Sequence, residues 1–446
     1  MTAALRRGWG PDLLGCAGVV SLLAVTALWV RDGGVQAFGT GWGGVTALGR
    51  LAGLGSADLL LIQVLMMARV PWIERVYGQD RLARVHRLAG FTSFHLLLGH
   101  LVLITVGYAG AGHVPVPREA WDLVVTYPGM LLATAGTALL VLVVVTSVRA
   151  ARRRLRYESW HLLHLYGYLG VGLALPHQLW TGADFVGSAA ATAYWWTAYG
   201  LVAGAVLGYR VGLPLWRSAR HRLTVAAVVP EAPGVVSVYL HGRRLDRLPV
   251  RAGQFFTWRF LDGPGWSRAH PYSLSAAPRP DRLRITVKEL GDGSRRVATL
   301  RPGTRALVEG PYGRLTGQVR TARRITLIAC GVGITPLRAL LEEQPYRHGD
   351  AVLLYRARTP GDLVFRTELD RLAKARGVRL AYLVGPRAAP GSWRPRGAPQ
   401  LRELVPDIAG HDVYICGPQA WMAAASRAAR GAGVPPEHIH LEQFSW

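Results

Sequence analysis

Cysteine and lysine are both scarce in this chain of 446 residues. The three cysteines, Cys16, Cys330 and Cys416, stand far apart with no C-x2-C spacing, which excludes a zinc site of the common type and a cysteine-ligated iron–sulfur cluster. A calcium loop of the D-x-D-x-D-G type is also missing. Lysine occurs only as Lys288 and Lys374, so arginine carries nearly all of the positive charge.

The charge and the hydrophobicity of the chain do not suit a single soluble globule. The formal net charge is +25, yet half of the residues are hydrophobic. This combination fits a protein of which one half lies in a bilayer and the other half is basic and exposed to water. Because basic stripes interleaved with aromatic residues are missing, we expect no nucleic-acid partner.

Up to about residue 215, long apolar runs alternate with short polar loops. Each run is about as long as a membrane-spanning helix requires. The first run has no clean A-x-A exit, so we interpret it as a membrane helix and not as a signal peptide. The six predicted transmembrane helices are Leu13–Val30, Gly49–Val70, Val85–Tyr108, Tyr127–Val148, Trp160–Trp180 and Tyr194–Leu215.

The arginines in the loops predict the orientation of these helices, because cytoplasmic loops are enriched in positive charge. Five arginines lie at 69–87, between the second and third runs, and five more at 149–156, between the fourth and fifth. The loops of the opposite side carry few. We therefore expect a multi-pass protein of the cytoplasmic membrane with both termini in the cytoplasm.

After about residue 216, the pattern changes twice. Short β-type segments separated by turn residues predict an antiparallel β-barrel over 217–319. From about residue 320, strands alternate with helices, which predicts an α/β domain with a parallel sheet that binds a nucleotide, over 320–446. The predicted fold class is thus a multi-domain membrane protein, with a six-helix transmembrane bundle at 1–216 ahead of these two domains.

Histidines inside the third apolar run are candidate metal ligands, since imidazole is a common axial ligand of haem iron. His86 and His100 are 14 residues apart, which on a helix places them within about 40° of one face and about 21 Å apart. His95 falls on the opposite face, and we exclude it.

The fifth run carries His161, His164 and His177. His164 and His177 would be misaligned by about 140° on an ideal helix, and His161 aligns no better with His177. Pro176 can kink the helix end and reduce this mismatch. Because both runs cross in the same direction, we expect His86 to pair with His164 near the cytoplasm and His100 with His177 near the outer face. The alternative is that these histidines only form hydrogen bonds within the bundle.

Two motifs in the predicted barrel are typical of a flavin site. An aromatic and a hydroxyl residue can lie against the flavin ring, and a glycine turn at a helix start offers N–H groups to a pyrophosphate. The first motif is His270, Pro271, Tyr272 and Ser273, and the second is Gly291, Gly293 and Ser294.

The last domain carries two turns that each join an apolar strand to a helix. The first contains Gly331, Gly333, Thr335 and Pro336, and the second contains Cys416, Gly417 and Pro418. Glycines allow a tight turn against a cofactor pyrophosphate, although the usual fingerprint has a third glycine where Pro336 stands. Cys416 could face a nicotinamide or be a small buried residue. Arg356 and Arg358 follow the next strand and favour the 2′-phosphate of NADPH, with NADH as the alternative.

Together, these residues resemble the ferric reductase and NADPH oxidase superfamily over about residues 45–446. The resemblance implies haem b ligation by His86, His100, His164 and His177, FAD binding at His270–Ser273 and Gly291–Ser294, and NADPH binding at the two later turns. It also implies a C-terminal aromatic that stacks on the flavin, for which we choose Phe444 although Trp446 also qualifies. Where soluble relatives carry arginine, this chain has His270, which leaves the pyrophosphate to Lys288 or to backbone N–H groups.

The implied activity is transfer of electrons from cytoplasmic NADPH through FAD and two haems to an acceptor outside. We expect dioxygen, giving superoxide. The alternatives are a ferric chelate and a redox partner protein, and a rival hypothesis makes the membrane half a mere anchor for a flavin reductase. The oligomeric state stays open.

Overall fold

The computed structural model describes residues 3–155 and 157–442. The chain divides into two compact units, 1–210 and 211–446, and each is described by itself.

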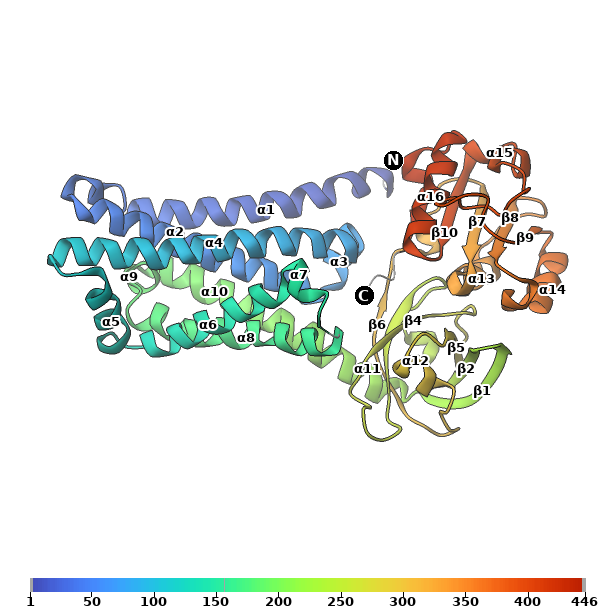
Figure 1. Cartoon of the computed structure of the whole chain (residues 1–446), viewed down its shortest axis with the longest axis horizontal. Coiled ribbons are helices and arrows are strands. Elements are labelled where there is room, and N and C mark those ends of the chain that lie inside the picture. The colour runs from blue at the N-terminus through green and yellow to red at the C-terminus, as the bar shows by residue number, and fades with distance from the viewer. Residues whose placement is uncertain (1–2, 156, 443–446) are drawn as a thin grey trace. The chain divides into compact units, whose positions relative to one another are not determined.

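The first unit is helical, and its helices overlap the six predicted apolar runs (Figure 1). Among the described residues, four helical stretches are long and apolar enough to cross a membrane: Trp42–Met67, Arg81–Gly112, Met130–Ser147 and Ala189–His221. Six spanning helices therefore stay a prediction. A shorter apolar stretch covers Gly15–Arg31. The helices are α1 (Ala3–Arg31), α2 (Trp42–Met67), α3 (Pro71–Tyr77), α4 (Gln79–Gly112), α5 (Val116–Thr126), α6 (Met130–Ser147), α7 (Arg149–Arg152), α8 (Tyr157–Trp180), α9 (Ala183–Val186) and α10 (Ala189–Ala205), with a short 3-10 helix at Gln36–Thr40 and a π-helical segment at Val206–Gly212.

Small residues allow two pairs of these helices to pack closely, α2 against α4 and α6 against α8. A Cβ atom added to Gly136 of α6 would lie 2.6 Å from the carbonyl oxygen of Gly170 on α8. On the other pair, a Cβ atom added to Gly49 of α2 would lie 2.9 Å from the backbone nitrogen of Ile104 on α4. Such close backbone approach is typical of helices that associate in membranes, where van der Waals packing drives association.

The second unit begins with α11 (Leu213–His221) and six antiparallel strands. They form two three-stranded sheets, in the orders β1-β2-β5 and β4-β3-β6, around a shared core that includes Phe256, Trp258 and Ile285. An isolated bridge between Leu274 and Ile285 links the sheets. The elements are β1 (Thr224–Ala232), β2 (Val235–His241), β3 (Phe255–Phe260), β4 (His270–Ser273), β5 (Arg282–Lys288), α12 (Asp292–Val297) and β6 (Ala306–Tyr312).

A five-stranded parallel sheet follows, in the order β11-β10-β7-β8-β9. Leu337 of α13 and Leu369 of α14 belong to the apolar core of one face, and Trp421 of α16 belongs to the core of the other. In sheets of this kind, ligands bind outside the carboxyl ends of the strands, where the strand order reverses. The elements are β7 (Arg324–Cys330), α13 (Ile334–Glu343), β8 (Ala351–Ala357), α14 (Arg366–Arg376), β9 (Arg379–Val384), α15 (Leu401–Leu404), β10 (His411–Cys416), α16 (Gln419–Gly431) and β11 (Ile439–Leu441).

Candidate redox centres

His86 of α4 and His164 of α8 lie together, with 6.0 Å between the centres of their rings. Two imidazoles that share one metal ion, each with a metal–nitrogen distance of about 2.0–2.1 Å, would have their ring centres about 6 Å apart. The structure therefore brings together the first predicted pair at a separation that suits a bis-histidine site.

His100 of α4 and His177 of α8 are close enough to interact electrostatically. Two glycines make room for them. A Cβ atom added to Gly53 of α2 would lie 2.5 Å from Nδ1 of His100, and one added to Gly129 would lie 2.8 Å from the backbone nitrogen of His177. The second predicted pair thus lies within electrostatic range, and Pro176 lies inside α8 without ending it.

The Nδ1 atoms of all four histidines are within hydrogen-bond distance of an oxygen. The acceptors are the carbonyl groups of Gln63 for His86 (3.2 Å), Gly49 for His100 (2.9 Å) and Ala174 for His177 (2.5 Å), and the hydroxyl of Ser147 lies 3.2 Å from His164. Because a carbonyl can only accept, Nδ1 carries the proton in the first three, which leaves Nε2 unprotonated and able to bind a metal. Among the described residues, no protein atom forms a hydrogen bond with Nε2 of any of the four.

The other observations agree with this assignment. His95 is exposed, and its Nδ1 lies 2.7 Å from the carbonyl oxygen of Phe91 in the same helix. Within 3–155 and 157–442, no group of three or more His, Cys, Asp or Glu side chains could hold a metal ion.

The two flavin motifs lie against each other in the second unit. His270 and Tyr272 share one face of β4, with ring centres 6.1 Å apart and planes inclined by 27°. A Cβ atom added to Gly293, in the first turn of α12, would lie 2.3 Å from Cε1 of His270. The glycine is therefore required for this approach. Burial raises the pKa of Tyr272, so its hydroxyl stays protonated.

The remaining flavin residues surround this contact. Pro271 pairs with Thr257 across the β3–β4 ladder, and the buried Ser273 pairs with Phe255. The hydroxyl of Ser294 accepts hydrogen bonds from the backbone N–H groups of Leu290 (2.8 Å) and Gly291 (3.1 Å), so it stabilises the turn itself. Lys288 is exposed at the end of β5.

The two predicted nucleotide turns pack together at the carboxyl ends of the neighbouring strands β7 and β10. A Cβ atom added to Gly333 would lie 2.2 Å from the carbonyl oxygen of Cys416, and one added to Gly417 would lie 2.9 Å from Cβ of Cys330. Gly331 has a φ of +55°, which favours glycine. The hydroxyl of Thr335 donates to the carbonyl of Val332 (2.9 Å), and Pro336 occupies the first turn of α13. Pro418 is the N-cap residue of α16.

Basic side chains gather near this edge of the sheet. Lys288, Arg356 and Arg387 all act electrostatically on the Cys330 thiol, although burial outweighs them and raises the pKa of Cys330. Arg356 is 5% exposed and its guanidinium bonds the carbonyl of Ala357, whereas Arg358 is exposed and is the better placed of the two for a phosphate. Burial also raises the pKa of Cys416, which keeps this thiol neutral.

The chain end approaches the loop that follows β6. The carboxylate of Glu442 accepts hydrogen bonds from the backbone N–H groups of Arg314 (2.9 Å) and Leu315 (3.1 Å). Phe444 and Trp446 lie outside the described residues. Neither Glu442 nor Gly53 was predicted, because nothing in the local sequence distinguishes them from other acidic or glycine residues.

Comparison with known proteins agrees with both halves of this description. Residues 52–175 match the family model described as ferric reductase like transmembrane component, and residues 327–427 match the oxidoreductase NAD-binding domain. The ferredoxin–NADP reductase B of Sorangium cellulosum is 32% identical over 49% of this chain and 96% of its own length. The second half of the chain therefore belongs to the ferredoxin–NADP reductase family, and its fusion to a ferric-reductase-like transmembrane part matches the architecture of ferric reductases and NADPH oxidases.

Other relatives of this ferric-reductase-like chain share the reductase half. The ferredoxin reductase component of 3-ketosteroid-9-alpha-monooxygenase from Mycolicibacterium smegmatis is 34% identical over 50% of this chain, and the match spans 65%, just under two thirds, of that protein. The FAD/NAD-binding domain of nitric oxide dioxygenase from Vibrio cholerae O1 biovar El Tor aligns with a TM-score of 0.43 and 25% identity, over 50% of this chain and 98% of that domain.

The ferric-reductase-like chain is thus an FAD- and NAD(P)H-dependent oxidoreductase. Its helical first part and the family match indicate an integral membrane protein, and its second part is a reductase module of the ferredoxin reductase type.

Proposed function

We propose that this chain moves electrons from cytoplasmic NADPH, through FAD and two haems b, to dioxygen on the outer side of the membrane, with superoxide as the product. In the overall reaction, one NADPH and two dioxygen molecules are converted to one NADP⁺, one proton and two superoxide ions. When bound, FAD supplies the conversion of a two-electron hydride into single electrons, and the haems carry those electrons one at a time. In this proposal, residues 1–216 form the six-helix diheme domain, 217–319 the FAD barrel and 320–446 the NADPH domain, and both termini are cytoplasmic.

The observation that carries the proposal is the arrangement of the four histidines. His86 and His164 lie 6.0 Å apart between ring centres, and three of the four Nδ1 atoms donate to backbone carbonyls. A hydrogen bond of this kind fixes the tautomer and the orientation of a ligand imidazole. Histidines that served only to hold the bundle together would not all leave Nε2 without a partner among the residues that the structure describes.

The reductase half supports the direction of transfer. His270 and Tyr272 form an aromatic face beside the turn at Gly293, which suits the flavin ring. The exposed Lys288 and Arg387 near Cys330 suit the phosphates of NADPH. The fully buried Cys416 offers a neutral thiol and not a thiolate beside the turn at Gly333, so we assign it a packing and orienting role.

A second candidate acceptor is a partner protein outside the membrane. It is favoured because several relatives are named as reductase components or subunits of monooxygenases. A ferric chelate is the third acceptor to be tested.

Anaerobic visible spectroscopy of the detergent-purified protein tests the proposal. We expect NADPH to reduce two haems per FAD, and admitted air to reoxidise them within the turnover time. Haem that is reduced but stays reduced in air would refute dioxygen and favour a partner protein or a ferric chelate. If no haem band is present, the haem pathway is wrong.

The outer pair can be tested separately with His100→Leu. This variant should keep reduction of FAD by NADPH and lose one haem and all transfer to the outer acceptor. His95→Leu is a matched control, because His95 is exposed on the same helix. Full acceptor activity in His100→Leu would exclude His100 as a ligand.

A further inference from the structure

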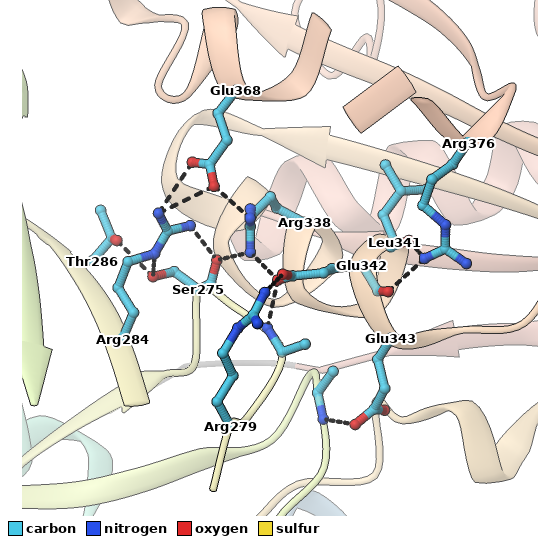
Figure 2. A network of polar contacts seen from close by, with 12 residues as sticks. Ser275, Arg279, Arg284, Thr286, Arg338, Leu341, Glu342, Glu343, Glu368 and Arg376 are labelled. Atoms are coloured by element: carbon cyan, nitrogen blue, oxygen red, sulfur yellow. Dashed lines mark hydrogen bonds and ion pairs between the residues drawn. The ribbon is translucent and has the colours of Figure 1, made fainter. Parts of the chain in front are cut away.

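A network of charged side chains joins the segment after β4, the strand of the first flavin motif, to α13, which follows the turn Gly331–Gly333, called the nicotinamide turn below (Figure 2). Its central members are Arg284 on β5, Arg338 on α13 and Glu368 on α14. Arg284 and Arg338 are each only 6% exposed. Charges are rarely buried to this degree unless they are paired, and pairing them this deep has a large desolvation cost.

The network converges on Ser275, which lies two residues after β4 and is completely buried. The carbonyl of Ser275 accepts hydrogen bonds from Nη2 of Arg284 (2.7 Å) and Nη1 of Arg338 (3.1 Å). Its hydroxyl accepts from Nε of Arg284 (3.1 Å) and from Thr286 (2.8 Å), and its N–H donates to the carbonyl of Arg284 (2.8 Å). Every polar atom of Ser275 is therefore bonded to β5 or to α13.

Glu368 allows the two guanidinium groups to lie side by side. Its carboxylate accepts hydrogen bonds from Nη1 of Arg284 (3.1 and 3.2 Å) and from Nη2 of Arg338. Burial lowers the pKa of Arg284, but Tyr239 and Glu368 more than offset this effect and raise it, so Arg284 stays charged. The planar fork of arginine can serve Ser275 and Glu368 at once, which the single ammonium group of lysine cannot.

Glu342 adds a second connection one turn further along α13. Its carboxylate accepts from the backbone N–H of Ala277 (2.8 Å), from Nη2 of Arg279 (3.4 Å) and from Nη1 of Arg338. Arg338 and Glu342, one turn apart on α13, are thereby held against the segment 275–279, which follows β4 (Figure 2).

These bonds link the two elements that, in the proposed function, hold the two reactants of hydride transfer. Strand β4 carries His270 to Ser273, and α13 begins immediately after Gly331–Gly333. Transfer requires reacting atoms about 3–3.5 Å apart, and a misplacement of about 1 Å can cost about 100-fold in rate. A buried ion pair contributes little to stability compared with an apolar substitute. The orientation that its hydrogen bonds give to α13 relative to β4 therefore accounts better for its presence here.

We propose that Arg284, Arg338 and Glu368 are positioning residues, which set the nicotinamide turn at hydride-transfer distance from the flavin strand through Ser275. The proposal rests on the proposed transfer from NADPH to FAD. None of the three residues touches the reacting atoms in this arrangement. Their effect is therefore expected in the rate of hydride transfer and not in the affinity for NADPH.

The test is stopped-flow reduction of the full-length protein by NADPH, with the flavin absorbance normalised to bound FAD. Arg338→Lys keeps the charge and loses the fork, and Glu368→Gln keeps the shape and loses the charge. We expect each to lower the limiting rate at saturating NADPH by at least 10-fold, with the Kd for NADPH within twofold of the wild type. Reduction by dithionite should be unchanged.

Arg376→Lys is the matched control. Arg376 binds the backbone carbonyls of Leu341, Glu342 and Gln344 at the C-terminal end of α13, so the change weakens the same helix without removing a side-chain bond to Ser275, Arg338 or the Glu342 carboxylate. Its limiting rate should stay within twofold of the wild type, even where its melting temperature falls.

The inference is overturned by a limiting rate within twofold of the wild type in Glu368→Gln, by an equal fall in Arg376→Lys, or by a change confined to the Kd. Glu368 is partly exposed, so Glu368→Gln provides the test even if Arg338→Lys does not fold. If NADPH does not reduce the wild-type flavin at all, the proposed function fails first, and the dithionite control distinguishes that result from a positioning defect.

Discussion

The close approach of Gly53 to His100 predicts that one methyl group can remove the outer haem. In Gly53→Ala, the added Cβ would lie 2.5 Å from Nδ1, 2.9 Å from Cε1 and 3.0 Å from Cγ of the His100 ring. Carbon atoms in ordinary contact are about 3.5–4.0 Å apart, so the ring must move by about 1 Å. Metal–ligand distances tolerate only about 0.2 Å.

The size of the effect follows from the same contacts. Overpacking costs about 1–3 kcal/mol, and the gain in helix propensity from glycine to alanine offsets about 0.5–1 kcal/mol of it. The shifted ring also loses its 2.9 Å hydrogen bond to the carbonyl of Gly49. Loss of such a bond behind a metal ligand lowers metal affinity by about 10–100-fold. We expect the purified variant to hold about one haem per FAD.

The assay is the pyridine haemochromogen spectrum, together with flavin released by denaturation. Gly99→Ala is the matched control, because Gly99 precedes His100 on α4 and has no other atom within 4 Å of the added Cβ. It should keep two haems per FAD and normal oxidation in air. Two haems per FAD in Gly53→Ala, with unchanged reoxidation, would refute both the steric argument and the role of His100.

Two further predictions concern the reductase half. Gly333→Ala brings a Cβ atom to 2.2 Å from the carbonyl oxygen of Cys416, and this backbone atom cannot rotate away. The Kd for NADPH in stopped-flow reduction should therefore rise by about 10-fold, which corresponds to about 1.4 kcal/mol. Gly431→Ala meets nothing within 4 Å and should leave the Kd unchanged, whereas an unchanged Kd in Gly333→Ala would contradict the packing of the two turns. Burial raises the pKa of Asp412, but the hydrogen bonds from His440 and from two backbone N–H groups outweigh it and lower that pKa. A lowered carboxyl pKa stabilises the fold above the unfolded value of about 3.9 and loses that contribution as pH falls through the folded value. Melting temperatures should therefore fall less steeply below about pH 4 in Asp412→Asn than in the wild type, and parallel curves would contradict this account.

The positions of the helices could be predicted from the sequence, because a bilayer demands apolar runs of a minimum length and arginine-rich loops between them. The two nucleotide turns could be predicted for a similar reason, since glycines after an apolar strand have few other uses. The charged network could not. Arg284 and Glu368 are 84 residues apart, and each looks like one more surface charge in a chain rich in arginine.

Arg356 shows how packing decides what a sequence position does. Its place after a strand predicted a phosphate ligand, yet every residue of β8 is buried and the guanidinium turns to the carbonyl of Ala357. The central position of β8 between β7 and β9 determines this burial, and no local pattern reports the order of strands in a sheet.

The sequence by itself determined which histidines could serve, because spacing and membrane depth depend only on the chain. Only the tertiary structure decided that His86 meets His164 and that His100 approaches His177, since an ideal helix misaligns His164 and His177 by about 140°. How far one helix is rotated about its axis relative to the next depends on the small residues between them, such as Gly53 and Gly136. Such contacts join residues far apart in the chain, so their effect exists only once the helices have packed.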